Sequence, residues 1–168
     1  EPLEEAADAD TILAARRPTP NDVNEVIYTS GTTGQPKGVM HTANTTFGHL
    51  SVWIEHHGLN SVDKIFMASP LAHQTGFLYA ILQPMMLGIE VILLDRWSAP
   101  VGVELMQKHG CTFNMGATPF LSDIVEMPNV ENFDLSMLRT FASAGAPIPP
   151  ALVQKAAANF SFRVLSGW

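Results

Sequence analysis

The chain has 168 residues, of which 46% are hydrophobic and 15% are charged. This balance is typical of a folded domain with a hydrophobic core and excludes an intrinsically disordered segment. The formal net charge is −7, and five acidic residues among the first ten leave only −2 for the rest, so the sequence indicates no basic surface for nucleic acid.

The N-terminal segment is acidic and resembles a linker in composition. We expect residues 1–24 to form a solvated lead-in and residues 25–168 to form the folded domain. A signal peptide would be basic here, and the apolar stretch 76–94 is interrupted by Gln83, Pro84, Gly88 and Glu90, so neither a leader nor a membrane span is predicted. Because the chain starts without methionine, we expect it to be an excised part of a longer protein.

Apolar runs alternate with segments of helical spacing along the rest of the chain. The predicted strands cover residues 25–29, 64–68, 90–94, 112–115, 138–142 and 162–165, and the predicted helices cover residues 43–57, 76–87, 100–109, 119–126 and 149–159. This alternation predicts an α/β fold with a largely parallel sheet flanked by helices on both faces. Ligands of such sheets bind beyond the carboxyl ends of the strands, where we expect the loops at Ser30, Ser69 and Ser143 to converge.

The most informative loop lies in residues 28–42, which read YTSGTTGQPKGVMHT. It follows a predicted strand, and the residues after Lys37 have helical spacing, so we expect a strand-to-helix turn whose free amides and helix dipole favour anions. Hydroxyls, glycines that allow close backbone approach, and one lysine together indicate a polyphosphate site. These residues are Ser30, Gly31, Thr32, Thr33, Gly34, Lys37 and Gly38.

A P-loop is the main alternative for this segment. In that motif the lysine follows a glycine directly and a hydroxyl residue comes next. Here Lys37 follows Pro36 and precedes Gly38, so the hydroxyl that would hold magnesium is missing. The run Val91 to Asp95 resembles the strand and aspartate that complete a P-loop site, although a strand that ends in aspartate at a turn is common. A P-loop-like NTPase and a non-catalytic nucleotide-binding module both remain open.

Twelve residues of this loop, YTSGTTGQPKGV, resemble the signature of the adenylate-forming (AMP-binding) superfamily, which includes acyl-CoA synthetases. Three further segments are similar in the same order: SPLAHQTGF at 69–77, ASAGAP at 142–147 and VLSGW at 164–168. The resemblance implies that residues 25–168 are part of the large N-terminal domain of such an enzyme. The family pattern would continue with a threonine and a glutamate, so the domain is truncated at its C-terminal end.

The resemblance also implies roles for individual residues. Lys37 and His73 would be catalytic, and His73 would lie beside the acyl-binding pocket. The β- and γ-phosphates of ATP would be held by Thr29, Ser30, Gly31, Thr32, Thr33, Gly34 and Lys37. Adenine would lie along Gly145, Ala146 and Pro147, with Trp168 stacked on it. Most ligands of Mg²⁺, the rest of the N-terminal domain and the C-terminal lid domain would lie outside this chain.

The expected activity of the parent is that of an acyl-CoA synthetase, an acid-thiol ligase that joins a carboxylic acid to coenzyme A through an acyl-adenylate. An adenylation domain that loads a carrier protein remains an alternative. The apolar, methionine-rich segment 77–87 weakly favours a hydrophobic acid over an amino acid, whose ammonium group would need an acidic partner. We expect the 168 residues alone to be inactive.

The cysteine content indicates the cellular compartment of the protein. Cys111 is the only cysteine, so no internal disulfide can form, and the sequence fits a reducing compartment. We expect a cytoplasmic protein.

Overall fold

The computed structural model describes residues 9–29 and 34–167. It divides the chain into two compact units, residues 1–52 and residues 53–168. The division falls within helix α2 (Ala43–His57), which begins in the first unit and ends in the second. No helix in the described part of the chain is both long and apolar enough to cross a bilayer.

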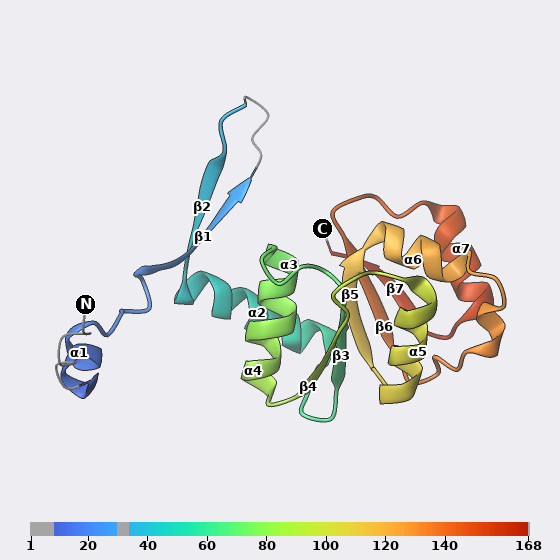
Figure 1. Ribbon diagram of the computed structural model, residues 1–168, viewed down its shortest axis with the longest axis horizontal. Helices are drawn as coiled ribbons and strands as arrows, with labels where there is room; N and C mark the ends of the chain where they lie inside the picture. The colour runs from blue at the N-terminus through green and yellow to red at the C-terminus, as the bar shows by residue number, and fades with distance from the viewer. Residues whose placement is uncertain (1–8, 30–33, 168) are drawn as a thin grey trace, which may run out of the picture. The chain divides into compact units, whose positions relative to one another are not determined.

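The first unit contains helix α1 (Ala9–Ala15), within the expected lead-in, and a β-hairpin. Strands β1 (Val23–Thr29) and β2 (Lys37–Thr42) pair antiparallel, with Thr29 opposite Lys37 (Figure 1). The prediction of helical structure directly after Lys37 is therefore wrong. The backbone groups of residues 37–42 pair with β1. The glycine-rich loop therefore joins two strands, and no helix dipole points toward it.

Helix α2 begins only after Thr42. Two reciprocal hydrogen bonds between Thr42 and Thr45 mark the end of strand β2. The Thr42 amide donates to Thr45 Oγ1 at 2.9 Å, and the Thr45 amide donates to Thr42 Oγ1 at 3.3 Å. Two hydroxyls thereby satisfy amides that a helix start leaves free, in the manner of a capping box.

The second unit is built on a five-stranded parallel sheet in the order β4-β3-β5-β6-β7, which confirms the predicted fold class (Figure 1). The strands are β3 (Lys64–Met67), β4 (Glu90–Leu93), β5 (Phe113–Ala117), β6 (Thr140–Ala144) and β7 (Arg163–Ser166). The predicted first strand, residues 25–29, is not part of this sheet, because β1 pairs only with β2 among the described strands.

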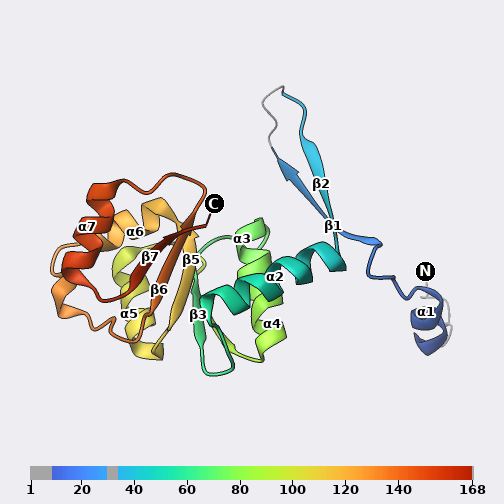
Figure 2. The ribbon, with the colours of Figure 1, turned by 180° about the vertical axis from the view of Figure 1, so that it is seen from behind.

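Helices cover both faces of this sheet (Figures 1 and 2). One face carries α5 (Ala99–His109), α6 (Thr118–Val125) and α7 (Pro150–Asn159). The core on this face includes Phe66, Val103, Leu121, Phe141 and Leu152, all of which are buried. The loop between α6 and β6 contains the short 3₁₀ helix η2 (Val130–Asn132).

The opposite face carries one helical run with an irregular middle. It comprises α3 (Gln74–Phe77), the π-helical turn η1 (Leu78–Leu82) and α4 (Gln83–Leu87), where the sequence predicts one regular helix. The Gln83 amide donates to the Leu78 carbonyl five residues back, and Pro84, which follows, has no N–H to continue a regular ladder. The last turn of α2 packs on the same face, where the Trp53 and Phe113 ring centroids lie 6.2 Å apart.

Proline and glycine mark the helix boundaries. Pro100, Pro119 and Pro150 lie in the first turns of their helices, where a missing N–H costs nothing. Gly88 and Gly110 end α4 and α5 in the left-handed conformation, with φ of 66° and 61°.

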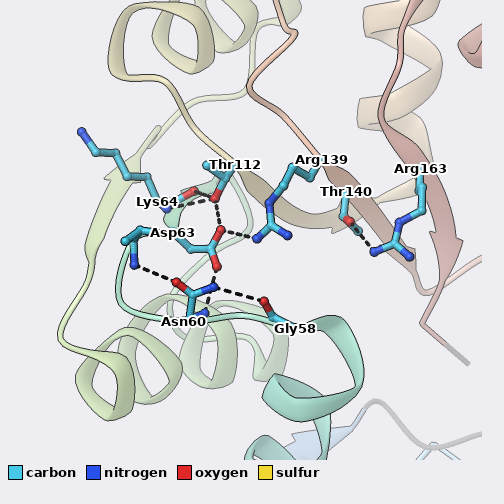
Figure 3. A network of polar contacts seen from close by, with 9 residues as sticks. Gly58, Asn60, Asp63, Lys64, Thr112, Arg139, Thr140 and Arg163 are labelled. Atoms are coloured by element: carbon cyan, nitrogen blue, oxygen red, sulfur yellow. Dashed lines mark hydrogen bonds and ion pairs between the residues drawn. The ribbon is translucent and has the colours of Figure 1, made fainter.

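A buried carboxylate ties together the amino ends of three strands (Figure 3). Asp63 is 3% exposed and accepts hydrogen bonds from Thr112 Oγ1 at 2.5 Å, from the Asn60 amide at 2.9 Å and from Arg139. Burial raises the pKa of Asp63, but the bonds from Thr112 and Arg139 outweigh burial and lower it below 3.8. This clamp lies at the edge of the sheet opposite the carboxyl ends of the strands.

Candidate functional site

The end of the hairpin presents the residues on which the phosphate prediction rests. Thr29 and Lys37 face each other across the ladder, and Thr29 Oγ1 donates to the Lys37 carbonyl at 3.5 Å. Both residues are exposed, and no carboxylate within the described residues pairs with Lys37. The ammonium group is therefore available to an anionic ligand. Ser30, Gly31, Thr32 and Thr33 lie outside the described residues, as does Trp168.

Two glycines explain why this segment can form a tight hairpin. Gly34 has φ of 83°, a conformation that other residues rarely adopt. A Cβ atom on Gly38 would lie 2.9 Å from Val26 Cγ1, so a side chain there would force the Val26 side chain to move. The glycines that the sequence assigns to phosphate contact thus also have a structural role in the hairpin.

A topological switch point lies in the five-stranded sheet between β3 and β5. After β3 the chain enters the α3–η1–α4 face, whereas after β5 it enters α6 on the opposite face (Figure 1). The loops at the carboxyl ends of these neighbouring strands therefore diverge, and such a divergence is where open α/β sheets bind their ligands.

A pocket of about 480 Å³ opens at the carboxyl ends of β3 and β4. Its lining is mostly apolar, with polar groups from Ser69 and Asp95. The complete lining is Met67, Ala68, Ser69, Pro70, Leu71, Leu93, Leu94 and Asp95. Ser69 begins the segment SPLAHQTGF, so the structure brings part of this motif to the edge of the sheet where the sequence predicts it.

His73 follows this loop and caps α3. Its side chain is exposed, and its Nδ1 accepts a hydrogen bond from the Thr75 amide at 3.1 Å. Because Nδ1 accepts, the neutral ring carries its proton on Nε2, which can donate to a ligand. Gly76 holds the loop in place: a Cβ there would lie 2.2 Å from the Pro70 carbonyl oxygen.

The turn after β6 carries the residues predicted to lie along adenine. Gly145 has φ of 87° and is exposed, as is Pro147. Thr118 at the start of α6 anchors this turn, because its Oγ1 lies 2.8 Å from Ser143 Oγ and donates to the Ala146 carbonyl at 3.1 Å. Thr118 has no role in the sequence prediction, whereas Ser143 lies in the segment ASAGAP and marks one of the loops expected at the ligand edge.

The end of β7 lies beside this turn. The Gly167 amide donates to the Ser143 carbonyl at 2.7 Å. A Cβ on Gly167 would lie 3.0 Å from Met115 Cε and 3.2 Å from Ala144 Cβ. The segments ASAGAP and VLSGW, which are separate in sequence, are therefore neighbours in the fold.

The geometry does not support the P-loop alternative. A P-loop connects a strand to a helix, whereas the loop before Lys37 connects two antiparallel strands. Asp95 follows β4, the outer strand of a sheet that contains neither strand of the hairpin. Its Oδ1 accepts a hydrogen bond from the Arg96 amide at 2.9 Å, which is an ordinary turn interaction.

Similarity to known proteins identifies the family of the chain. The model of the AMP-binding enzyme family matches residues 1–168. The chain belongs to the AMP-binding enzyme family. This membership confirms the resemblance to the adenylate-forming (AMP-binding) superfamily. The family match also includes residues 1–24, for which the sequence predicts a lead-in.

The AMP-binding relatives include several CoA ligases. The chain is 33% identical over 149 residues to the medium-chain fatty-acid–CoA ligase of Escherichia coli (strain K12), a match that covers 89% of the chain and 26% of the relative. It is 31% identical over 156 residues to the 3-[(3aS,4S,7aS)-7a-methyl-1,5-dioxo-octahydro-1H-inden-4-yl]propanoyl:CoA ligase of Rhodococcus jostii (strain RHA1), over 93% of the chain and 30% of the relative. The chain thus spans roughly a quarter to a third of the length of these proteins.

The fold matches a domain of known structure. The N-terminal domain of FACL13 from Mycobacterium tuberculosis superposes with a TM-score of 0.77 at 26% identity, over 92% of the chain and 39% of that domain. The assignment to the N-terminal domain of an adenylate-forming enzyme is thereby confirmed.

Proposed function

We propose that the whole protein is an ATP-dependent carboxylate–CoA ligase. A carboxylate oxygen of the acid attacks the α-phosphorus of ATP, the bond from this phosphorus to the β-phosphate bridging oxygen breaks, and pyrophosphate leaves. The thiolate of coenzyme A then attacks the acyl carbon, and AMP leaves as the thioester forms. The proposal is supported by the hairpin with its exposed Lys37, which pairs with no carboxylate among the described residues, in a chain of the AMP-binding enzyme family whose relatives include CoA ligases.

The adenylation step needs no general base, because the carboxylate is already a charged nucleophile. Repulsion between the acid and the triphosphate must be offset, and the charge on the departing pyrophosphate must be stabilised by positioned donors. We assign this role to Lys37 and to the hairpin loop. The loop residues are Thr29, Ser30, Gly31, Thr32, Thr33 and Gly34.

The carboxyl edge of the sheet supplies the remaining groups. Gly145, Ala146 and Pro147 would lie along adenine, with Trp168 stacked on the base. His73 would donate from Nε2 to the acid, since Nδ1 is already bonded to Thr75. The hydrogen bonds that anchor this turn and orient the His73 imidazole support these roles.

Magnesium would accompany ATP, and its ligands are expected mainly outside this chain. The described residues contain no group of three or more histidine, cysteine or acidic side chains that could hold a metal ion. The family's requirement for the ion is therefore assigned to the whole protein. A cytoplasmic location and the inactivity of the isolated 168 residues belong to the same proposal.

Carboxylate-dependent exchange of labelled pyrophosphate into ATP tests the adenylation step directly. The whole protein would be assayed with fatty, alicyclic, aromatic and amino acids, and we expect exchange with a hydrophobic acid. Lys37→Ala should reduce exchange by about 10²- to 10³-fold, the usual cost of removing one donor to a developing charge. Lys108→Ala, an exposed lysine at the end of α5, is the matched control and should leave the rate unchanged.

Two outcomes would change the proposal. ATP hydrolysis without any acid, and no exchange with any acid, would indicate an NTPase or a non-catalytic module. Exchange that persists while coenzyme A fails to accept the acyl group, and a carrier-protein thiol accepts it, would indicate an adenylation domain that loads a carrier.

A further inference from the structure

The outer strand of the sheet, β4, has a free edge. It pairs only with β3 among the described strands (Figure 1). Directly after β4, the Leu94 amide donates to the Met67 carbonyl at 3.0 Å, so the backbone groups of Leu94 point toward β3. Successive residues of a strand direct these groups to opposite sides. Ile92 therefore also faces β3, whereas Val91 and Leu93 direct their N–H and C=O groups outward.

This edge lacks the features that usually prevent further pairing. Native edge strands are often blunted by lysine, by proline or by a bulge. The two outward residues, Val91 and Leu93, are apolar, and Leu93 is 51% exposed. The register of β4 with β3 is regular along the whole strand, and Glu90, the only charged residue of β4, is paired with Lys64 of β3. The outer edge of β4 is therefore open to another strand.

Apolar hollows lie beside β4 on both faces of the sheet. On the face of α4, a hollow of about 420 Å³ has Ile81, Met85 and Val91 in its lining. On the face of α5, a hollow of about 400 Å³ has Ile92 and Leu105 in its lining. Side chains of a strand point alternately to the two faces of a sheet. A strand placed beside β4 would thus direct its side chains into both hollows.

We infer that β4 pairs with a further strand, apolar on both faces, which the whole protein supplies from outside these 168 residues. The edge is four residues long, which corresponds to about 13 Å. Contacts between separate molecules usually need more than about 1,000 Å² of buried surface, so so short an edge favours a partner on the same polypeptide. Such a partner is held nearby at high effective concentration, and a few hydrogen bonds are then enough.

The length of related proteins supports this source. The chain covers 39% of the FACL13 N-terminal domain on which it superposes, so that domain contains much further chain from which a strand can come. The inference concerns the completion of the sheet and does not depend on the proposed ligase activity.

Amide hydrogen exchange of the whole wild-type protein tests the pairing without any variant. The amides of Val91 and Leu93 should be protected to within about tenfold of those of Ile92 and Leu94, which face β3. On a free edge the outward amides face solvent. Protection that alternates along β4, with Val91 and Leu93 exchanging more than about tenfold faster than their neighbours, would overturn the inference.

The oligomeric state during this measurement identifies the source of the strand. Light scattering would establish whether the protein is a monomer at the concentration used. Protection of Val91 and Leu93 in the monomer supports a strand from the same polypeptide. Protection that appears only when the protein dimerises would overturn this source and indicate that a second copy covers the edge.

A matched pair of variants tests whether the hollow on the α4 face is filled. Met85 is 74% exposed, and lysine is a good helix former, so Met85→Lys should be harmless if the hollow stays open. If an apolar strand fills it, Met85→Lys should lower the melting temperature of the whole protein by about 3 °C or more. Met137→Lys, at a methionine that is 59% exposed before β6, is the control and should change it by less than about 1 °C. Equal melting temperatures for the two variants would overturn the inference.

Discussion

The hairpin and the five-stranded sheet hold their residues in different ways. In the hairpin, Tyr28 is 72% exposed and Met40 is 68% exposed, so backbone pairing and glycine conformation maintain the structure. In the sheet, Phe66, Phe113 and Phe141 are each 1% exposed, and close packing maintains it. Lys37, the proposed phosphate ligand, is therefore carried by an element with little core, whereas the proposed adenine turn rests on a packed scaffold.

The largest effect should come from truncating the sheet core. Phe141→Ala should cost about 3–5 kcal/mol of unfolding free energy, because it removes a buried ring and leaves a cavity. Met40→Ala in the hairpin should cost less than about 0.5 kcal/mol, since the side chain is mostly in solvent. Urea unfolding of both variants measures the contrast, and equal costs would show that the hairpin is packed as tightly as the sheet.

The next effect concerns the Asp63 clamp. Asp63→Asn should cost about 2–3 kcal/mol at neutral pH, because Arg139 and Thr112 lose a charged acceptor. The lowered pKa of Asp63 means that its ionised form stabilises the fold above pH 3.8, and this contribution is lost as the pH falls through the folded-state pKa. The difference in unfolding free energy between the wild type and Asp63→Asn should therefore vanish in acid.

An exposed ion pair between β3 and β4 provides the control for the Asp63 clamp. Lys64 Nζ and Glu90 Oε2 lie 3.0 Å apart, but both side chains are well exposed. Glu90→Gln should cost less than about 1 kcal/mol. If Glu90→Gln costs as much as Asp63→Asn, burial is not what makes the Asp63 clamp strong.

A smaller effect on stability is expected for the turn at residues 145–147, which Thr118 anchors. Thr118→Val keeps the shape of the side chain but removes its contacts with Ser143 and Ala146, and should cost about 1–2 kcal/mol. It should also raise KM for ATP in the exchange assay, because the turn at Gly145 loses its anchor. Ser51→Ala removes an exposed hydroxyl bond to Phe47 in α2 and should cost less than about 0.5 kcal/mol. An unchanged KM in Thr118→Val would separate this turn from nucleotide binding.

The smallest expected effect is a pH dependence of the unfolding free energy, which His57 causes. Burial lowers its pKa below 6.5, and the nearby positive charges of His56 and Arg163 lower it further. The unfolded chain then binds the proton more tightly, so stability should fall as the pH drops below 6.5. His57→Phe keeps a ring against Trp53 and should flatten this slope in unfolding measurements from about pH 7.5 to about pH 5, whereas His56→Phe should flatten it only in part, because it removes one of the charges that lower the pKa of His57. An unchanged slope in His57→Phe would assign the dependence to another group.

The sequence predicts the sheet unit well and the hairpin poorly. Apolar runs such as 65–68 form strands that are buried on both faces, and a continuous apolar run of this length predicts such a strand. The strand Lys37–Thr42 has only a short alternation and little burial, so local spacing alone favours a helix there. The π-helical turn depends on Pro84 and on packing, which a periodic pattern does not encode.

The same distinction applies to the candidate site. Lys37, His73 and the turn at Gly145 lie in contiguous motifs, and the resemblance reaches them at once. Thr118 and Ser143 are 25 residues apart, and Asp63 and Arg139 are 76 residues apart. Ser143 lies in the segment ASAGAP, which the resemblance also reaches. Thr118, Asp63 and Arg139 acquire a role only when the fold brings them to their partners, so sequence spacing gives no signal for them.

The switch point between β3 and β5 also has a consequence for cooperativity. The register joins these strands through two residue pairs, Ile65 with Phe113 and Phe66 with Asn114, whereas β5 and β6 share five. Thr112 extends this short seam, since its amide donates to the Lys64 carbonyl at 2.9 Å and its Oγ1 accepts from the Lys64 amide at 3.0 Å. We expect amide hydrogen exchange to be faster along β3 than along β5 and β6, because the short seam between β3 and β5 is the line along which the sheet opens first and closes last during folding.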